Sequence, residues 1–231
     1  MENIKENPVR YFPIYLEIRN KKILVIGGGV VAQRKIESLL GAGANIVVVS
    51  KDLTPQIREY QEEGRIAVVG REYDKALLEK VFMVIAATDE AELNHRISRD
   101  AMEKGLLVNA VDQPKDCNFI FPSLLKRGDL VLAISTSGKS PALAKKIRER
   151  LELEFGDEYE ILLNIMGYLR QEIFSWNLPQ HKNSQLFGQL IEGSLLDAIH
   201  EKNWDRATKI INTTLNRDYS IGKIKTIGEG G

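Results

Sequence analysis

The stretch ILVIGGGVVAQRK, residues 23–35, decides the fold, because an apolar run leads into a glycine-rich turn and then into a helix-like segment. Gly27, Gly29 and Ala32 give the spacing G-x-G-x-x-A. Glycines at such a turn let a pyrophosphate approach the start of the next helix, whose unpaired N–H groups favour an anion. The spacing also fits a tight turn that holds no ligand, but its position between a strand and a helix favours a dinucleotide site.

The same alternation of strand and helix continues along the first half of the chain. Apolar runs predict five strands, at Lys22–Ile26, Ile46–Val49, Ile66–Val69, Met83–Ala87 and Leu107–Val111. Helix-like stretches lie between them and include Val31–Ala42, Thr54–Glu63 and Ala91–Lys104. This order is typical of a doubly wound parallel sheet covered by helices on both faces, a Rossmann-like α/β fold.

The pattern changes near residue 119. FIFPSLLKRG and DLVLAISTSG predict a hairpin with its turn at residues 127–129, and a basic helix should follow with Ser140 as N-cap and Pro141 as its first residue. Apolar spacing of three and four predicts further helices, separated by the polar stretch NLPQHKNSQ and ending in a frayed IGKIKTIGEGG. We expect a Rossmann-like domain over 1–118, a hairpin-plus-helix module over 119–150 and a helical domain over 151–231.

Composition excludes several classes of protein. The 231 residues carry 32 Lys and Arg against 32 Asp and Glu, so no overall positive charge favours nucleic acid. Apolar runs fall short of the roughly 18 residues of a membrane span, and the first residues lack a signal peptide's apolar block, so we expect a cytoplasmic protein. One cysteine, Cys117, and three scattered histidines (His95, His181 and His200) predict neither an internal disulfide nor a metal site.

Polar residues follow the predicted second and fourth strands. Ser50, Lys51 and Asp52 come after the second, where an acidic residue would hold a ribose hydroxyl and a basic one would suit a 2′-phosphate, so the residues alone leave NAD and NADP open. Thr88 and Asp89 follow the fourth strand and fit either a cofactor role or the capping of the next helix.

Asp112 follows the fifth predicted strand, in the segment VNAVDQPKDCNFIFPS. Aspartate is common in turns, and the Gln-Pro pair after it fits a turn. A carboxylate at the carboxyl edge of such a sheet also suits a general base beside a bound cofactor. The spacing alone does not choose between these two interpretations.

Four segments together resemble one known family. These are YFPIYLEIRNKKILVIGGGVVAQRK, IAATDEAELN, VNAVDQPKDCNFIFPS and LAISTSGKSPALAKKIRERLE. In this order and spacing, from about Tyr11 to about Leu153, they resemble the siroheme synthase family of precorrin-2 dehydrogenases. The resemblance implies oxidation of precorrin-2 to sirohydrochlorin with NAD, and it raises insertion of ferrous iron as a further step. We do not expect the methyltransferase domain fused to some members, since no chain remains to hold it.

The resemblance also implies the site residues. Cofactor contacts should fall at Val30 and Val31 in the glycine turn and at Lys51 and Asp52 after the second strand. It favours NAD over NADP, because Asp52 can approach the ribose and nothing in the sequence beyond Lys51 suggests a clamp for a phosphate. The functional aspartate of the family maps onto Asp112.

The substrate that the resemblance implies carries several acetate and propionate groups, so basic residues should bind it. The candidates are Arg34, Lys126, Arg127, Lys139, Lys145 and Lys146. Each of them taken singly also fits an ordinary solvated helix or hairpin. Ser135 and Thr136 depart from the Ser-Ser pair of some relatives but keep a hydroxyl at each position. We expect Cys117 to be a buried or half-buried thiol without a catalytic role.

Two other classes compete with a dehydrogenase. A nucleotide-sensing regulatory domain would use the same glycine turn without chemistry, and a SAM-dependent methyltransferase would use a looser one. The hairpin and basic helix favour the dehydrogenase, because neither alternative needs them. We also expect a homodimer built through this module, since an isolated two-stranded hairpin is marginal in water.

Overall fold

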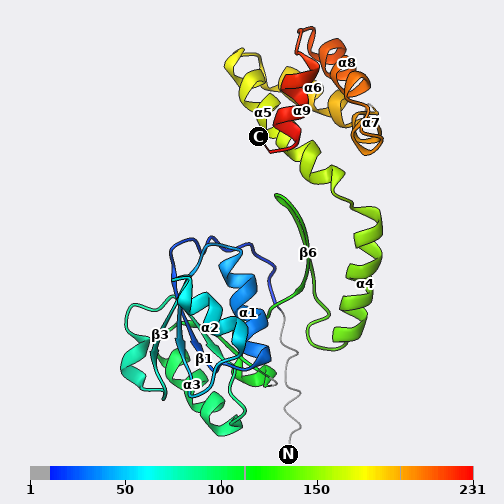
Figure 1. Ribbon diagram of the computed structural model, residues 1–231. Coiled ribbons are helices and arrows are strands. Elements are labelled where there is room, and N and C mark those ends of the chain that lie inside the picture. The colour runs from blue at the N-terminus through cyan, green and yellow to red at the C-terminus, as the bar shows by residue number, and fades with distance from the viewer. Residues whose placement is uncertain (1–10, 112, 193, 231) are drawn as a thin grey trace, which may run out of the picture. The chain divides into compact units, whose positions relative to one another are not determined.

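The computed structural model describes residues 11–111, 113–192 and 194–230 (Figure 1). They form two compact units, the first ending at Phe121 and the second beginning at Pro122. The division at residues 118 and 150 stays a prediction. Asp112 lies outside the described residues. Within the described part of the chain, no helix is long and apolar enough to cross a membrane.

The first unit contains the expected parallel sheet. Its strands are β1 (Lys22–Ile26), β2 (Asn45–Val49), β3 (Ile66–Gly70), β4 (Met83–Ala86) and β5 (Leu107–Ala110). They pair in the order β3-β2-β1-β4-β5, all parallel, so the direction of winding reverses between β1 and β4. Open α/β sheets bind ligands at such a reversal, outside the carboxyl ends of the strands. The predicted Rossmann-like fold is therefore confirmed.

Helices cover both faces of this sheet, which is why its strands read as continuous apolar runs. On one face, Ile23 and Val25 of β1 pack in a cluster with Ile36 of α1 (Val30–Leu40) and Ile57 of α2 (Pro55–Glu62). On the other face, residues of β1 and β4 pack with Ile97 of α3 (Ala91–Glu103) and with the short 3₁₀ helix η1 (Lys75–Leu78). A second 3₁₀ helix, η2 (Pro114–Asp116), follows β5. These two layers fix the carboxyl edge of the sheet in place.

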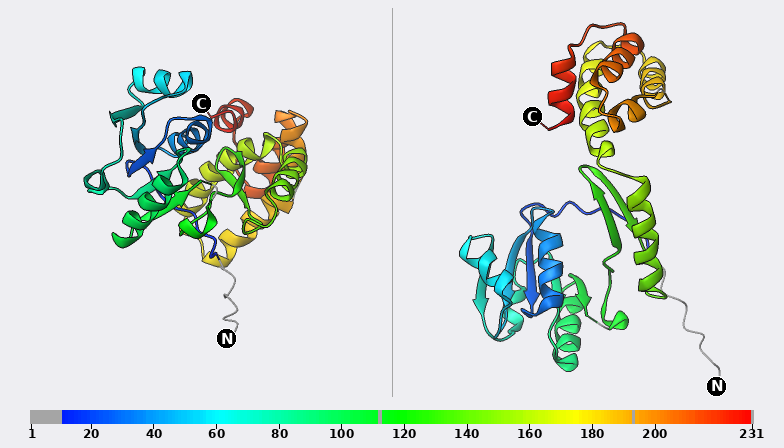
Figure 2. Two further views of the ribbon diagram at one scale, coloured as in Figure 1. Left: turned by 90° about the horizontal axis from the view of Figure 1, so that it is seen from below. Right: turned by 45° about the vertical axis from the view of Figure 1, so that its right-hand side comes forward.

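The second unit begins with the expected hairpin and basic helix. Antiparallel strands β6 (Ser123–Arg127) and β7 (Leu130–Ile134) are joined by a turn at Gly128, whose φ is +55°. Helix α4 (Pro141–Glu154) packs beside the hairpin (Figure 2). The Ser140 hydroxyl accepts a hydrogen bond from the Leu143 N–H, and Pro141 is the first helical residue, as predicted.

The rest of the second unit is helical and has its own core. Its helices are α5 (Glu158–Ser175), α6 (Gln180–Glu192), α7 (Leu195–His200), α8 (Trp204–Leu215) and α9 (Ile221–Gly228). Fully buried Ile165, Leu169 and Ile173, each one turn apart on α5, form the centre of that core.

Two local predictions in this region were wrong. Most of the polar stretch NLPQHKNSQ belongs to α6, and the end expected to be frayed forms α9. The Ser220 hydroxyl caps α9 by accepting from the Lys223 N–H, and Ile224 is buried in the core. In the sequence, the few apolar residues of this segment were too weak a periodic signal beside its four glycines.

Candidate functional site

A cleft of about 1150 Å³ opens at the carboxyl edge of the first unit's sheet. The ends of β1, β2 and β4, the loop after β3 and one side of α3 form its walls. Its lining includes Gly27, Gly28, Gly29, Ser50, Lys51, Asp52, Arg71, Glu72, Tyr73, Thr88, Asp89, His95, Arg96 and Arg99. The structure thus brings Gly27, Gly29, Lys51, Asp52, Thr88 and Asp89 of the predicted cofactor residues to one cleft.

The glycine turn passes between two loops that leave no room for side chains. Gly27 has φ +114°, and a Cβ on it would lie 2.1 Å from the backbone oxygen of Ala87. A Cβ on Gly28 would lie 2.2 Å from the backbone oxygen of Asp52. Around Gly29, in contrast, no atom lies within 4 Å of the place a Cβ would take. The first two glycines close the turn, and the third leaves open space at the start of α1.

That open space fits the pyrophosphate of a dinucleotide. Gly29 is the N-cap of α1 and brings no side chain to the N–H groups of the first helical turn, which remain available to an anion. Val30 and Val31 are the first residues of α1, with 59% and 42% of their surfaces exposed. Their side chains do not line the cleft. A cofactor contact at Val30 and Val31 would therefore come from their backbone.

Charged residues follow both β2 and β3 at one end of the cleft. Lys51 and Asp52 come after β2, and Arg71 and Glu72 come after β3. The Lys51 ammonium lies 3.6 Å from a Glu72 carboxylate oxygen. Arg71 and Glu72 were not predicted from the sequence. The sequence suggested no clamp for a phosphate beyond Lys51, but Arg71 lines the same cleft because β2 and β3 are neighbours in the sheet.

Thr88 serves the local structure of the β4 end. Its hydroxyl donates to the side-chain oxygen of buried Asn94 at 2.8 Å, and the Asn94 amide donates to the Thr88 backbone oxygen at 2.9 Å. Glu90, not Asp89, is the N-cap of α3. Within the described part of the chain, the Asp89 carboxylate has no hydrogen bond or ion pair. The capping interpretation of Asp89 is therefore wrong, and its carboxylate lines the cleft.

His95 of α3 links the cleft to the segment after β5. It lines the cleft, and its Nδ1 lies 2.9 Å from Oδ1 of buried Asp116 in η2. The Ser98 hydroxyl donates to the Asp116 backbone oxygen at 2.6 Å. The sequence predicted a structural His95, and its contact with Asp116 was missed because the two residues are 21 positions apart.

A tyrosine and an arginine complete the α3 side of the cleft. The Tyr73 hydroxyl donates to a carboxylate oxygen of buried Asp100 at 3.2 Å, and the Arg96 guanidinium lies 5.6 Å from the Tyr73 ring centre. Burial, together with the negative charge of Asp100, raises the pKa of the Tyr73 hydroxyl well above its ordinary value. Tyr73 is therefore a neutral, fixed wall residue at physiological pH.

The residues on either side of Asp112 are tied together by Cys117. The Cys117 thiol donates toward the backbone oxygens of Ala110 and Gln113 at 3.2 and 3.3 Å, and its sulfur accepts from the Ala110 N–H at 3.2 Å. Burial raises the pKa of this thiol, which keeps it protonated and able to donate. The expected half-buried thiol is confirmed.

The basic residues predicted to bind substrate lie in both units. Arg34 is exposed on α1 and does not line the cleft. In the second unit, Lys126 of β6 and Lys139 before α4 are exposed. Arg127 is mostly buried, and its Nε lies 3.4 Å from the Asp157 carboxylate, so a structural ion pair already engages it. Among residues 11–111, 113–192 and 194–230, no group of three His, Cys, Asp or Glu could hold a metal ion.

Comparisons with known proteins match both parts of the chain. A family model described as putative NAD(P)-binding matches residues 14–123, and one described as sirohaem biosynthesis protein central matches residues 127–152. A solved structure, the precorrin-2 dehydrogenase SirC, aligns with a TM-score of 0.74 and 26% identity, over 89% of this chain and 100% of that one.

Curated relatives extend the match over nearly the whole chain. Siroheme synthase of Sodalis glossinidius is 45% identical over 223 residues, which cover 96% of this chain and 47% of that protein. Siroheme synthase of Zymomonas mobilis is 35% identical over 95% of this chain and 47% of its own length. The chain spans about half the length of the curated relatives it matches. Over nearly its whole length, the chain is therefore similar to about half of each of these siroheme synthases, and it shares its fold with a precorrin-2 dehydrogenase.

Proposed function

We propose that this protein oxidises precorrin-2 to sirohydrochlorin with NAD. The observation that carries the proposal is the cleft at the winding reversal, which opens at a helix start that has no side-chain cap, in a fold shared with a precorrin-2 dehydrogenase. A dehydrogenase needs a dinucleotide and a tetrapyrrole side by side. The cleft is proposed as the first site, and Asp112, which follows β5 in the sequence, is proposed to act at the second.

The residues present fit NAD. The N–H groups at the start of α1 would hold the pyrophosphate, and Asp52 would accept a hydrogen bond from the adenosine ribose. Bound NAD supplies a hydride acceptor. Gly27 and Gly28 allow the close approach, because the loops that carry Ala87 and Asp52 leave no space for a side chain at either position.

The protein's own contribution to the chemistry is a proton acceptor and a set of cations. Loss of a hydride from precorrin-2 is accompanied by loss of a proton, which we assign to the Asp112 carboxylate. Arg34, Lys126 and Lys139 are proposed to bind the carboxylates of the substrate. The ion pair of Arg127 with Asp157 makes Arg127 a weaker candidate than these three residues.

An anaerobic assay with precorrin-2 and NAD tests this function. We expect the tetrapyrrole spectrum to change to that of sirohydrochlorin, with growth of the NADH absorbance. A nucleotide-sensing domain would bind NAD without changing either spectrum, and this result would overturn the proposal. Omitting NAD is the matched control, since the reaction needs an electron acceptor.

Insertion of ferrous iron is the second step that the family resemblance raises. The macrocycle supplies four nitrogen ligands for the metal, so the protein needs only to help remove the pyrrole protons, a task that suits the same Asp112 carboxylate. Adding ferrous iron after dehydrogenation is complete separates the two activities. Siroheme formation faster than in a control without protein supports chelation, and equal rates limit the protein to dehydrogenation.

We further propose a homodimer that forms through the hairpin and α4. Their apolar side chains remain partly exposed, with 44% of Leu124, 51% of Leu143 and 89% of Leu153 accessible. In the described residues the hairpin is a sheet of two strands, β6 and β7, and such a small sheet is marginal in water by itself. A second copy related by a two-fold axis would cover the same patch on both chains at once.

Light scattering at micromolar concentration should give twice the chain mass of 26.1 kDa. Leu124→Lys should shift the protein toward the monomer, because it places a charge in the proposed interface. Ile221→Lys is the matched control, since Ile221 lies on α9 and is 43% exposed against 44% for Leu124. A monomeric wild-type protein, or equal behaviour of the two variants, would contradict this interface.

A further inference from the structure

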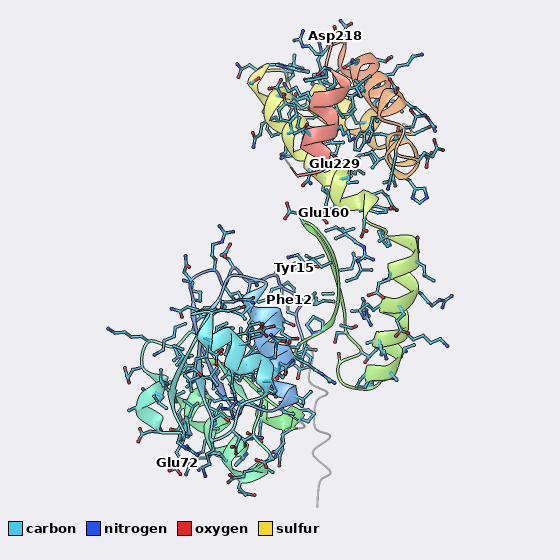
Figure 3. The ribbon with its side chains drawn as sticks, in the orientation of Figure 1. Phe12, Tyr15, Glu72, Glu160, Asp218 and Glu229 are labelled. Atoms are coloured by element: carbon cyan, nitrogen blue, oxygen red, sulfur yellow. The ribbon has the colours of Figure 1, made fainter. Side chains whose placement is uncertain are left out.

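We propose that Glu72 is a specificity-determining residue that disfavours NADP in the dinucleotide cleft. The inference rests on the proposed function, because it concerns the same cofactor site. Asp52, the residue expected from the sequence to select NAD, is in this view one of two acidic groups that face the adenosine ribose. Figure 3 labels Glu72 in the loop that follows β3.

The register of the sheet brings four charges together. Val49 of β2 is the partner of Gly70 of β3, so the residues after these strands leave the sheet side by side. Each strand end then supplies one cation and one carboxylate in the same order, Lys51-Asp52 after β2 and Arg71-Glu72 after β3. All four residues line the cleft.

These charges include groups that suit the 2′-hydroxyl of NAD and groups that suit the 2′-phosphate of NADP. An acidic residue near the end of the second strand of such a fold accepts hydrogen bonds from a ribose 2′-hydroxyl, whereas a nearby arginine accommodates a 2′-phosphate. Lys51 and Arg71 could bind the phosphate, but Lys51 already lies 3.6 Å from Glu72. Among the described residues, Arg71 has no ion-pair or hydrogen-bond partner. Glu72 therefore withholds one of two cations from a phosphate.

Glu72 also acts directly on the phosphate. A 2′-phosphate placed between Lys51 and Arg71 would lie near the Glu72 carboxylate, and like charges repel. The 2′-hydroxyl of NAD carries no charge and meets no such repulsion. The Lys51–Glu72 pair is solvent-exposed, with 57% and 79% of the side chains accessible, so its effect should be moderate and should weaken with salt.

The test is direct binding of NAD and NADP to the whole chain, measured by calorimetry at low ionic strength. Glu72→Gln keeps the size of the side chain and removes its charge. We expect its affinity for NADP, relative to NAD, to rise roughly fivefold to tenfold over wild type, and this gain to shrink as salt is added. An unchanged ratio of the two affinities would overturn the inference.

Two further variants separate this role from a general change in charge. Glu63→Gln removes the same charge from an ion pair with Arg65, 3.3 Å long, which does not line the cleft, so the ratio should stay at the wild-type value. Adding Arg71→Ala to Glu72→Gln should cancel most of the rise in relative NADP affinity, because the 2′-phosphate then loses one of its two cations. An equal gain in Glu63→Gln would overturn the role of Glu72. Wild-type protein that binds neither dinucleotide would instead overturn the proposed function itself.

Discussion

Asp112→Ala is expected to lower the turnover of precorrin-2 by about 10²–10⁴-fold, the usual loss for a general acid–base group. The affinity for NAD should change little, because the residues proposed to hold NAD belong to the glycine turn and the end of β2. Alanine removes the proposed proton acceptor and changes none of the residues that line the cleft. Single-turnover kinetics under anaerobic conditions, with NAD affinity measured separately, give both quantities.

The described residues that flank Asp112 in the sequence are held by contacts of their own. Cys117 holds the backbone of Ala110 and Gln113 on either side of it, and Asp116 bonds His95 on the cleft wall. Each of these contacts is made by residues other than Asp112. The Asp112→Ala protein should therefore melt within a few degrees of the wild type.

A control variant and an assay of iron insertion show whether the effect of Asp112→Ala is specific to dehydrogenation. Asp129→Ala removes an exposed carboxylate from the hairpin turn and should leave NADH formation unchanged. If Asp112→Ala kept full dehydrogenase activity with an unchanged melting temperature, the carboxylate would be only a turn residue. If it still inserted iron into supplied sirohydrochlorin, its role would be confined to the redox step.

Gly27→Ala is expected to unfold the first unit or to destabilise it by more than about 3 kcal/mol. The new Cβ would lie 2.1 Å from the Ala87 backbone oxygen, and φ of +114° is strained for any residue with a side chain. Relief requires the ends of β1 and β4 to separate, which breaks the Ala87 N–H bond to the Ile26 oxygen. Binding of NAD should be lost together with stability. Thermal unfolding and calorimetry measure the two effects.

Gly29→Ala is the matched variant for this position. Gly29 has φ −80°, and nothing lies within 4 Å of the added Cβ, so stability should be close to that of the wild type. The Cβ does enter the space proposed for the pyrophosphate, so NAD affinity should fall while the melting temperature holds. Equal melting temperatures of Gly27→Ala and wild type would contradict the packing described for this turn.

The sheet could be predicted from the sequence because burial on both faces makes each strand a continuous apolar run. The Gly27–Ala32 spacing identified the first strand-to-helix turn, since only glycine fits between the Ala87 and Asp52 backbones. Helix α9 could not be predicted, because its stability comes from Ile224 in a core formed by residues distant in sequence. The glycines in and after this helix disfavour helical structure and led to the prediction of a frayed end.

Only part of the cleft could be predicted, because some of its residues come together through contacts between segments that are distant in sequence. Lys51 and Thr88 follow strands whose ends must meet at one edge, so their place followed from the alternation of strands and helices. Arg71 and Glu72 also follow a strand, but their proximity to Lys51 depends on β3 pairing beside β2. His95 lines the cleft as a residue of α3, and its contact with Asp116 joins residues that are distant in sequence, so no local pattern indicates it.

The most direct test of the account is the yield of NADH per sirohydrochlorin formed when purified protein receives precorrin-2 and NAD without oxygen. Conversion of precorrin-2 to sirohydrochlorin removes two electrons and so reduces one NAD. We expect equal amounts of NADH and sirohydrochlorin, formed faster than in a control without protein. Folded protein that binds NAD but yields no NADH from authentic precorrin-2 would contradict it.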